Sequence, residues 1–258
     1  MSSTDLKRFK SLFQEYTELR AQENRSIAVA IVKGNIITNF KRANGGVSAR
    51  VCKGGAWGFS SNPDTSPDSI AAVVKTATDN AAFLDSRERK GKGPLPAAPG
   101  SSRNDFSTKK PRLDQRAFIE FVREIDAYVL AKYPDLSSRS ISLSCLDMEK
   151  TLTTSDGSDS YSMIPRSIVG VSLSIEKDGT PIDLAKPFGG LGQFEDVFTS
   201  PEDLYPGIEA LYEHLRRKSE GVYARAGLHT CVLDADLAGI LAHEAIGHTT
   251  EADLVITG

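Results

Sequence analysis

The sequence predicts an α+β fold, in which antiparallel sheets carry flanking helices. Apolar residues alternate with period two in several runs separated by glycine turns, and other runs show helical periodicity. The chain has 258 residues, of which 40% are hydrophobic and 25% charged, enough for one large or two small cores. We therefore expect two α+β units at residues 1–86 and 113–258, joined by a linker or loop at residues 87–112.

The first unit is predicted as helix, strands, helix. Apolar residues recur at helical spacing from Leu6 to Leu19, after a serine or threonine cap. Pro67 stands at the first position of a later helix that runs through Leu84. Glycine turns and alternating apolar residues between these helices predict an antiparallel sheet. The expected strands are 27–32, 36–40, 47–51 and 56–60.

The segment 87–112 differs in composition from both units. It has eight Lys or Arg residues against two acids, four prolines, three glycines and few large apolar side chains. Such a segment buries too little surface to offset the entropy lost on ordering. We interpret it as a mobile linker or long loop, with a basic patch for a polyanion as the alternative.

The second unit begins with helical periodicity from Asp114 to Tyr133, which Pro134 ends. Alternation from Val169 to Ile175 predicts a strand with one wet and one buried face. The glycine-rich stretch 187–192 lacks a strand-to-helix phosphate-binding pattern and is predicted as a surface loop. The expected strands are 140–146, 151–154, 160–175 and 180–184, followed by a helix at 201–218.

The motif His243-Glu244-Ala245-Ile246-Gly247-His248 lies near the end of the sequence. A hydrolytic zinc site needs imidazole ligands, an open position for water and a carboxylate that takes the proton of that water. His243 and His248 are candidate metal ligands and Glu244 is the candidate general base. We expect the motif on a helix, capped by Asp234 or Asp236, after a short buried strand at 230–233.

The spacing of the two histidines is unusual. In a straight α-helix, five steps at ~100° rotate the second side chain by roughly 140° from the first. We therefore expect the helix to distort at residues 245–247, where Gly247 tolerates a bend. The alternative is a metal-free helix in which both histidines are packing residues.

This motif and its surroundings resemble a known family. The run HEAIGHTTEAD is similar to the HEAxGHxxExD signature of the TldD half of the TldD/PmbA metallopeptidases, often labelled modulators of DNA gyrase. Further upstream, residues 47–51 and the glycine-rich run 54–59 are similar to the family's N-terminal strands. The middle of the chain matches only in strand pattern.

The resemblance implies a zinc peptidase that acts on peptides or unfolded proteins with a PmbA-type (TldE) partner lacking the motif. It assigns His243 and His248 as zinc ligands and Glu244 as general base. The third ligand in the family is a cysteine of a C-terminal half that this sequence does not contain, and family members are roughly twice as long. We therefore expect an N-terminal fragment with an incomplete site.

Other residues could supply the third ligand. Glu251, one helical turn after His248, is the best internal candidate, although it could instead be a hydrogen-bond partner of a histidine. Asp253 is a weaker candidate. His229 and Cys231 are expected to pack on the preceding strand, and His214 to lie on a helix surface.

Composition limits the remaining functions. The net charge of −3 shows no electrostatic footprint for nucleic acid. Three separated cysteines predict no disulfide framework, and hence a reducing, cytoplasmic location. No signal peptide or membrane span is expected.

Two classes of function stay open: a zinc peptidase, and a non-catalytic binding subunit or fragment of a TldD/PmbA-like complex. The apolar run 254–256 suggests that a partner strand is missing, with exposed apolar surface and self-association as the consequence.

Overall fold

The computed structural model describes residues 5–87 and 97–251. By its internal contacts the chain forms two compact units, Met1–Glu220 and Gly221–Gly258, which are treated separately below. The run 254–256, and with it the expected exposed surface, lies outside the described residues.

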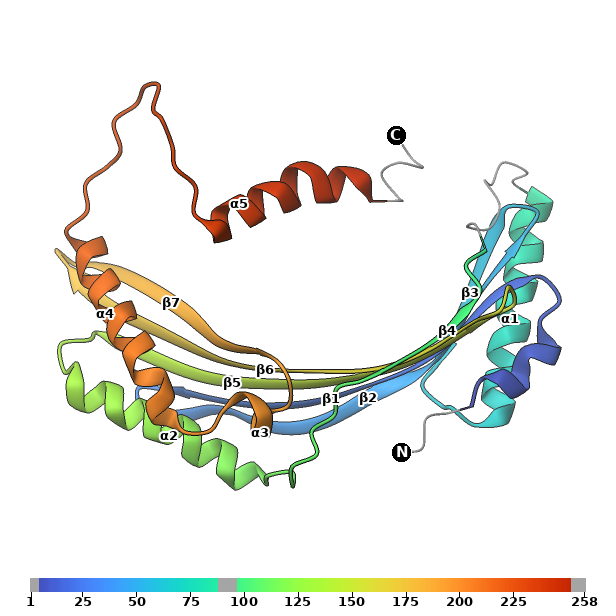
Figure 1. Cartoon of the computed structure of the whole chain (residues 1–258), viewed down its shortest axis with the longest axis horizontal. Coiled ribbons are helices and arrows are strands. Elements are labelled where there is room, and N and C mark those ends of the chain that lie inside the picture. Colours follow the sequence, from blue (N-terminus) through green and yellow to red (C-terminus); the bar gives the residue numbers. More distant parts are fainter. Residues whose placement is uncertain (1–4, 88–96, 252–258) are drawn as a thin grey trace. The chain divides into compact units, whose positions relative to one another are not determined.

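A curved seven-stranded sheet forms the first unit (Figure 1). The strand order is β3-β2-β1-β5-β6-β4, and β7 also pairs with β6. All pairings are antiparallel except that of β4 with β6. The strands are β1 (Tyr16–Val32), β2 (Asn35–Lys53), β3 (Ala56–Asn62), β4 (Gly100–Asp105), β5 (Ser138–Thr154), β6 (Ser158–Lys177) and β7 (Thr180–Leu191).

Helices cover one face of this sheet. The long helices are α1 (Pro67–Arg87), α2 (Gln115–Lys132) and α4 (Tyr205–Ser219). Shorter elements are the 3₁₀-helices η1 (Lys7–Leu12) and η2 (Pro201–Leu204) and the single turn α3 (Phe194–Val197). The starts of α1 at Pro67 and of α2 after Asp114 confirm the sequence predictions, and Asp114 caps α2 by accepting from the backbone N–H of Ala117 at 3.0 Å.

The prediction of a helix from Leu6 to Leu19 is wrong over most of this range. Only Lys7–Leu12 is helical, as a 3₁₀-helix, and β1 begins at Tyr16, where it pairs with β2. Leu19 is fully buried in this strand. Apolar residues at Tyr16 and Leu19 fit a helical spacing, but pairing with β2 and β5 satisfies the backbone and overrides that local preference.

The strands are longer than predicted. The expected strands 36–40 and 47–51 are parts of one strand, β2. Strand β7 continues through the expected loop at 187–192 as far as Leu191. Gly189 permits this because its φ is +110° and a Cβ there would lie 2.2 Å from the Ser167 carbonyl oxygen, so the two backbones approach too closely for any side chain.

Two hydrophobic clusters lie on the same face of the sheet. Leu19 belongs to the cluster beneath α1 and Ile27 to the cluster beneath α2 and α4. These residues are eight positions apart on β1, and side chains alternate between faces with period two, so both point to the same side. In Figure 1 this is the convex side, where α1 and α2 lie.

The α+β class is confirmed, but the sheet does not divide into the two α+β units that we expected. Strands from residues 16–62 and 138–191 pair in one sheet through β1 and β5. Of the predicted linker, residues 88–96 lie outside the described residues, and residues 100–105 form β4 on the edge of β6. The backbone N–H of Thr108 donates to the Gln193 side chain, and that of Leu113 donates to the Glu195 carboxylate. This part of the segment is therefore anchored at residues 193–195 of the same unit.

Within the described ranges, no helix is both long enough and apolar enough to cross a bilayer.

Candidate metal centre

The second unit carries the predicted motif on a short helix. Helix α5 (Ala235–Ala242) begins at Asp234, whose carboxylate accepts from the backbone N–H of Leu237 at 2.9 Å. Asp234 is therefore the N-cap residue of α5, which is one of the two residues predicted from the sequence. Residues 230–233, predicted as a buried strand, form no strand, and Val232 is 95% exposed. The backbone groups of a strand need a neighbouring strand, and the second unit contains none in its described part.

A π-helical turn continues α5 through the motif. This turn, η3, spans His243–Gly247, and a 3₁₀ turn, η4, spans His248–Thr250. The backbone N–H of His248 donates to the carbonyl oxygen of His243, an i→i+5 bond. Such a bond stacks each residue over the one five positions earlier, so the wider turn removes the angular offset expected in a straight α-helix.

The predicted distortion is confirmed, but it is a widened turn and not the expected bend at Gly247. Its φ of −57° and ψ of −56° are ordinary right-handed helical values. The chain therefore stays helical and gains one residue in the turn. A Cβ at position 247 would lie 3.9 Å from Nδ1 of His243, an ordinary van der Waals distance, so the turn does not require glycine for space.

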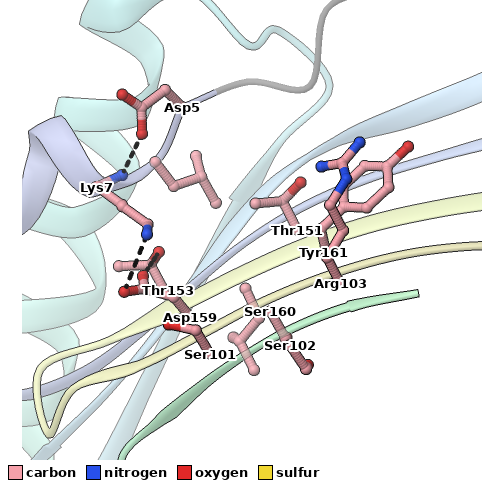
Figure 2. A pocket seen from close by; sticks show the side chains of 12 residues that line it. Asp5, Lys7, Ser101, Ser102, Arg103, Thr151, Thr153, Asp159, Ser160 and Tyr161 are labelled. Atoms are coloured by element: carbon pink, nitrogen blue, oxygen red, sulfur yellow. Dashed lines mark hydrogen bonds and ion pairs between the residues drawn. The ribbon is translucent and has the colours of Figure 1, made fainter. Parts of the chain in front are cut away.

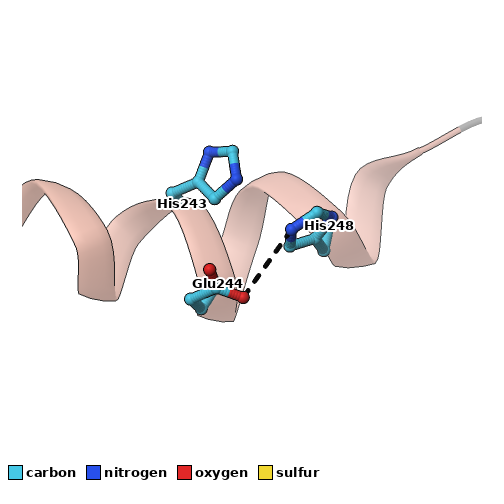
Figure 3. Close-up of side chains that lie close together, drawn as sticks. All are labelled: His243, Glu244 and His248. Carbon is cyan, nitrogen blue, oxygen red and sulfur yellow. Dashed lines mark ion pairs between the residues drawn. The ribbon is translucent and has the colours of Figure 1, made fainter. Parts of the chain in front are cut away.

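The turn brings the three motif side chains together. The imidazole ring centroids of His243 and His248 lie 4.6 Å apart with an interplanar angle of 78°. One potential ligand atom from each of His243, Glu244 and His248 lies within 4.8 Å of the other two. Figure 3 shows Glu244 directed toward His248, with its Oε2 at 3.6 Å from Nε2.

The donor atoms of these three side chains are of the chemical types that bind zinc. Zinc accepts imidazole nitrogen and carboxylate oxygen, and a catalytic site normally has three protein ligands and an open position. All three side chains are exposed, so solvent reaches them. Within the described residues this is the one group of histidine, cysteine and acidic side chains with such geometry.

The other candidate ligands lie elsewhere. Glu251 is outside the three-residue group and contacts Nδ1 of His248 through Oε1 at 2.6 Å. Nε2 of His229 contacts the Arg225 carbonyl oxygen at 2.8 Å. Cys231 is exposed and not on a strand, whereas His214 is on the exposed side of α4, as predicted. Asp253 lies beyond the described residues.

A cavity of about 470 Å³ in the first unit is a second place where a ligand could bind. It lies between η1 and the strands β4, β5 and β6 (Figure 2). Its charged groups are already partnered: Asp159 pairs with Lys10 at 3.2 Å and Lys7 at 3.5 Å, and Arg103 stacks over the Tyr161 ring at 4.0 Å. Sequence reasoning did not find it, because its lining comes from separate segments that share no motif.

Fold and motif together define a class: an α+β protein whose separate helical unit carries a histidine-glutamate-histidine group suited to a metal. The domain described as PmbA/TldA metallopeptidase domain 1 matches residues 17–81. A metalloprotease of Methanothermobacter thermautotrophicus is 25% identical over 248 residues, 95% of this chain and 52% of its own length. A second metalloprotease, of Methanocaldococcus jannaschii, is 25% identical over 94% of this chain and 53% of its own length.

Solved structures share the fold. A proposed modulator of DNA gyrase from Bacteroides thetaiotaomicron aligns with a TM-score of 0.70 at 15% identity, over 90% of this chain and 52% of that one. TldE from Thermococcus kodakarensis aligns with a TM-score of 0.56 at 12% identity, over 83% of this chain and 46% of that one. By these matches the chain is similar to the PmbA/TldD metallopeptidases, and it spans about half the length of the curated relatives that it matches.

Proposed function

We propose that this chain carries the zinc-binding motif of a TldD-type peptidase, which hydrolyses peptide bonds with a metal-activated water. The observation that carries the proposal is the π-helical turn, which places His243 over His248 with Glu244 beside them. Two relatives that align with nearly the whole of this chain are named metalloproteases, which supports a metal and a peptide or protein substrate.

In this proposal His243 and His248 hold the ion through ring nitrogens. When bound, zinc supplies a Lewis acid that polarises the scissile carbonyl and makes water acidic. Glu244 lies within the same group and is itself exposed, so its carboxylate can face a water molecule. It takes the proton of the attacking water and later donates it to the leaving amine.

Two imidazoles and the base do not complete the ligand set of a catalytic zinc, which normally takes three protein ligands. A third ligand must therefore come from outside the group of His243, Glu244 and His248. The resemblance implies a cysteine of a C-terminal half as this ligand, and as partners we propose either a PmbA- or TldE-like subunit or another copy of the chain. The likeness to the fold of TldE is compatible with such pairing between related subunits.

The second candidate function is a non-catalytic binding subunit or fragment of a TldD/PmbA-like complex. The observation that favours it is the candidate metal group of the described residues, which offers only two histidines and one glutamate. In this case the chain folds and associates, but it holds metal weakly because the ion is under-ligated.

Metal content and affinity decide between these functions. Purified chain is titrated with zinc against a chromophoric chelator, alongside His243→Ala, His248→Ala and Glu244→Gln. The proposal expects each histidine variant to lose roughly 100-fold or more in zinc affinity, beyond the 10–100-fold typical of residues that only support a ligand. Glu244→Gln retains zinc but loses peptidase activity.

His214→Ala is the matched control, because this histidine is exposed on α4 in the first unit. It should bind zinc as the unaltered chain does. Zinc affinity that does not depend on His243 or His248 would refute the proposed site. Weak zinc binding without hydrolysis of peptide or unfolded-protein substrates would favour the binding subunit.

A further inference from the structure

A short contact joins the last residue of the motif to a carboxylate outside it. Nδ1 of His248 lies 2.6 Å from Oε1 of Glu251. The backbone N–H of Glu251 also donates to the His248 carbonyl oxygen at 3.2 Å. The 3₁₀ turn η4 ends here, and Glu251 is the residue that directly follows it.

The chemistry of the two groups fixes the direction of this hydrogen bond. An ionised carboxylate can only accept, so Nδ1 of a neutral His248 must carry the proton. The ring then has the Nδ1–H tautomer, and Nε2 keeps its free electron pair. A metal-ligating histidine commonly donates its other ring N–H to a carboxylate, which fixes both the tautomer and the ring orientation.

The free nitrogen, Nε2, faces another member of the candidate metal group. Nε2 of His248 lies 3.6 Å from Oε2 of Glu244, which is longer than a hydrogen bond. Glu244 and His243 are the two other members of the candidate metal group, and Glu251 is not a member. Glu251 and Glu244 thus contact opposite nitrogens of one imidazole.

We infer that Glu251 is a positioning residue for His248, and that it holds the ring in the Nδ1–H tautomer with Nε2 presented to the metal. This inference rests on the proposed metal site. It excludes the other role open to Glu251, that of a direct zinc ligand. As a positioning residue, Glu251 acts by accepting a hydrogen bond from the Nδ1–H of His248, a role that an amide oxygen can also fill.

Two measurements on the chain test this role. The first is the tautomer of His248 in the metal-free protein, read from ¹⁵N chemical shifts of labelled imidazole above pH 8. The second is zinc affinity by chelator competition. Both are made on the unaltered chain, Glu251→Ala, Glu251→Gln and the control Asp236→Asn, which alters an exposed acid in the first turn of α5. Circular dichroism checks the helix content of each.

The Nδ1–H tautomer is expected in the unaltered chain, in Glu251→Gln and in the control. Glu251→Ala should shift His248 toward the Nε2–H form and lower zinc affinity by roughly 10–100-fold, the usual effect of losing an outer hydrogen-bond partner. Glu251→Gln should recover most of that affinity.

Three results would overturn the inference: an Nε2–H tautomer in the unaltered chain, unchanged affinity in Glu251→Ala, or equal losses in Glu251→Ala and Glu251→Gln. Equal losses would identify Glu251 as a charged ligand. Failure of the unaltered chain to bind zinc would instead refute the proposed function, while the tautomer, measured without metal, would still decide what Glu251 does.

Discussion

The backbone N–H of His248 donates to the carbonyl oxygen of His243, five residues earlier, and the two ring centroids lie 4.6 Å apart. The π-helical turn is therefore the element that lets a five-residue spacing place both imidazoles on one side of a helix. Turns of this kind are rare and are often found at functional sites.

Changing the number of residues between the two histidines should show whether zinc binding depends on the spacing of the ligands or only on their presence. Deletion of Ala245 gives a four-residue spacing, which an ordinary α-helical turn stacks on one face. Insertion of one alanine after Ala245 gives a six-residue spacing, and no regular helical turn places residues six positions apart on the same side. We expect the deletion to keep zinc binding and the insertion to lower zinc affinity by roughly 100-fold or more. Chelator competition measures both, and equal losses would show that the turn is not what aligns the ligands.

A buried ion pair ties α2 to β5. Arg139 donates to Asp126 through Nε at 2.8 Å and Nη2 at 3.1 Å, and their side chains are 12% and 8% exposed. Asp126→Ala leaves the guanidinium buried without a partner, which typically costs about 3–5 kcal/mol. Urea unfolding should show a loss of that size in the free energy of unfolding.

The exposed pair of Lys75 and Asp79 on α1 is the matched control for this prediction, since both side chains are more than half exposed. Asp79→Ala should change stability by about 0.5 kcal/mol or less. A similar effect for both aspartates would mean that Arg139 finds solvent or another partner.

The three cysteines should differ in reactivity. Burial raises the pKa of the Cys145 thiol to about 11 and also raises that of Cys52, whereas Cys231 is exposed. Because the thiolate is the reactive form, an aromatic disulfide reagent at pH 8 should modify Cys231 rapidly. It should modify Cys52 and Cys145 only after unfolding in urea. Cys231→Ser should abolish the fast phase. Two fast thiols in the native chain would contradict the burial of Cys52 or Cys145.

Asp64 should make the free energy of unfolding of the first unit depend on pH in the acid range. Hydrogen bonds from Ser66 and Ser69 at the start of α1 lower the pKa of Asp64 to about 2. Because the folded pKa lies below the unfolded value of about 3.9, this stabilisation is complete above pH 4 and is lost as the pH falls toward 2. Urea unfolding between pH 2 and 5 should therefore be less pH-dependent in Asp64→Asn than in the unaltered chain. Equal slopes would show that these hydrogen bonds do not persist in solution.

Local chemistry in the sequence was enough to predict the α+β class, the starts of α1 and α2, and a cap at Asp234 or Asp236, because each depends on residues close in the chain. The motif residues and the distortion between them could be predicted for the same reason. The extent of β1 and the pairing of β4 with β6 depended instead on strands far away in sequence, and so did the fusion of the two expected units into one sheet. At the motif, the backbone conformation decided that the helix widens into a π turn rather than bending at Gly247, and that Glu251 contacts His248 rather than joining the metal group. Residue spacing limits which side chains can meet, but only the backbone hydrogen-bond pattern determines which of them do.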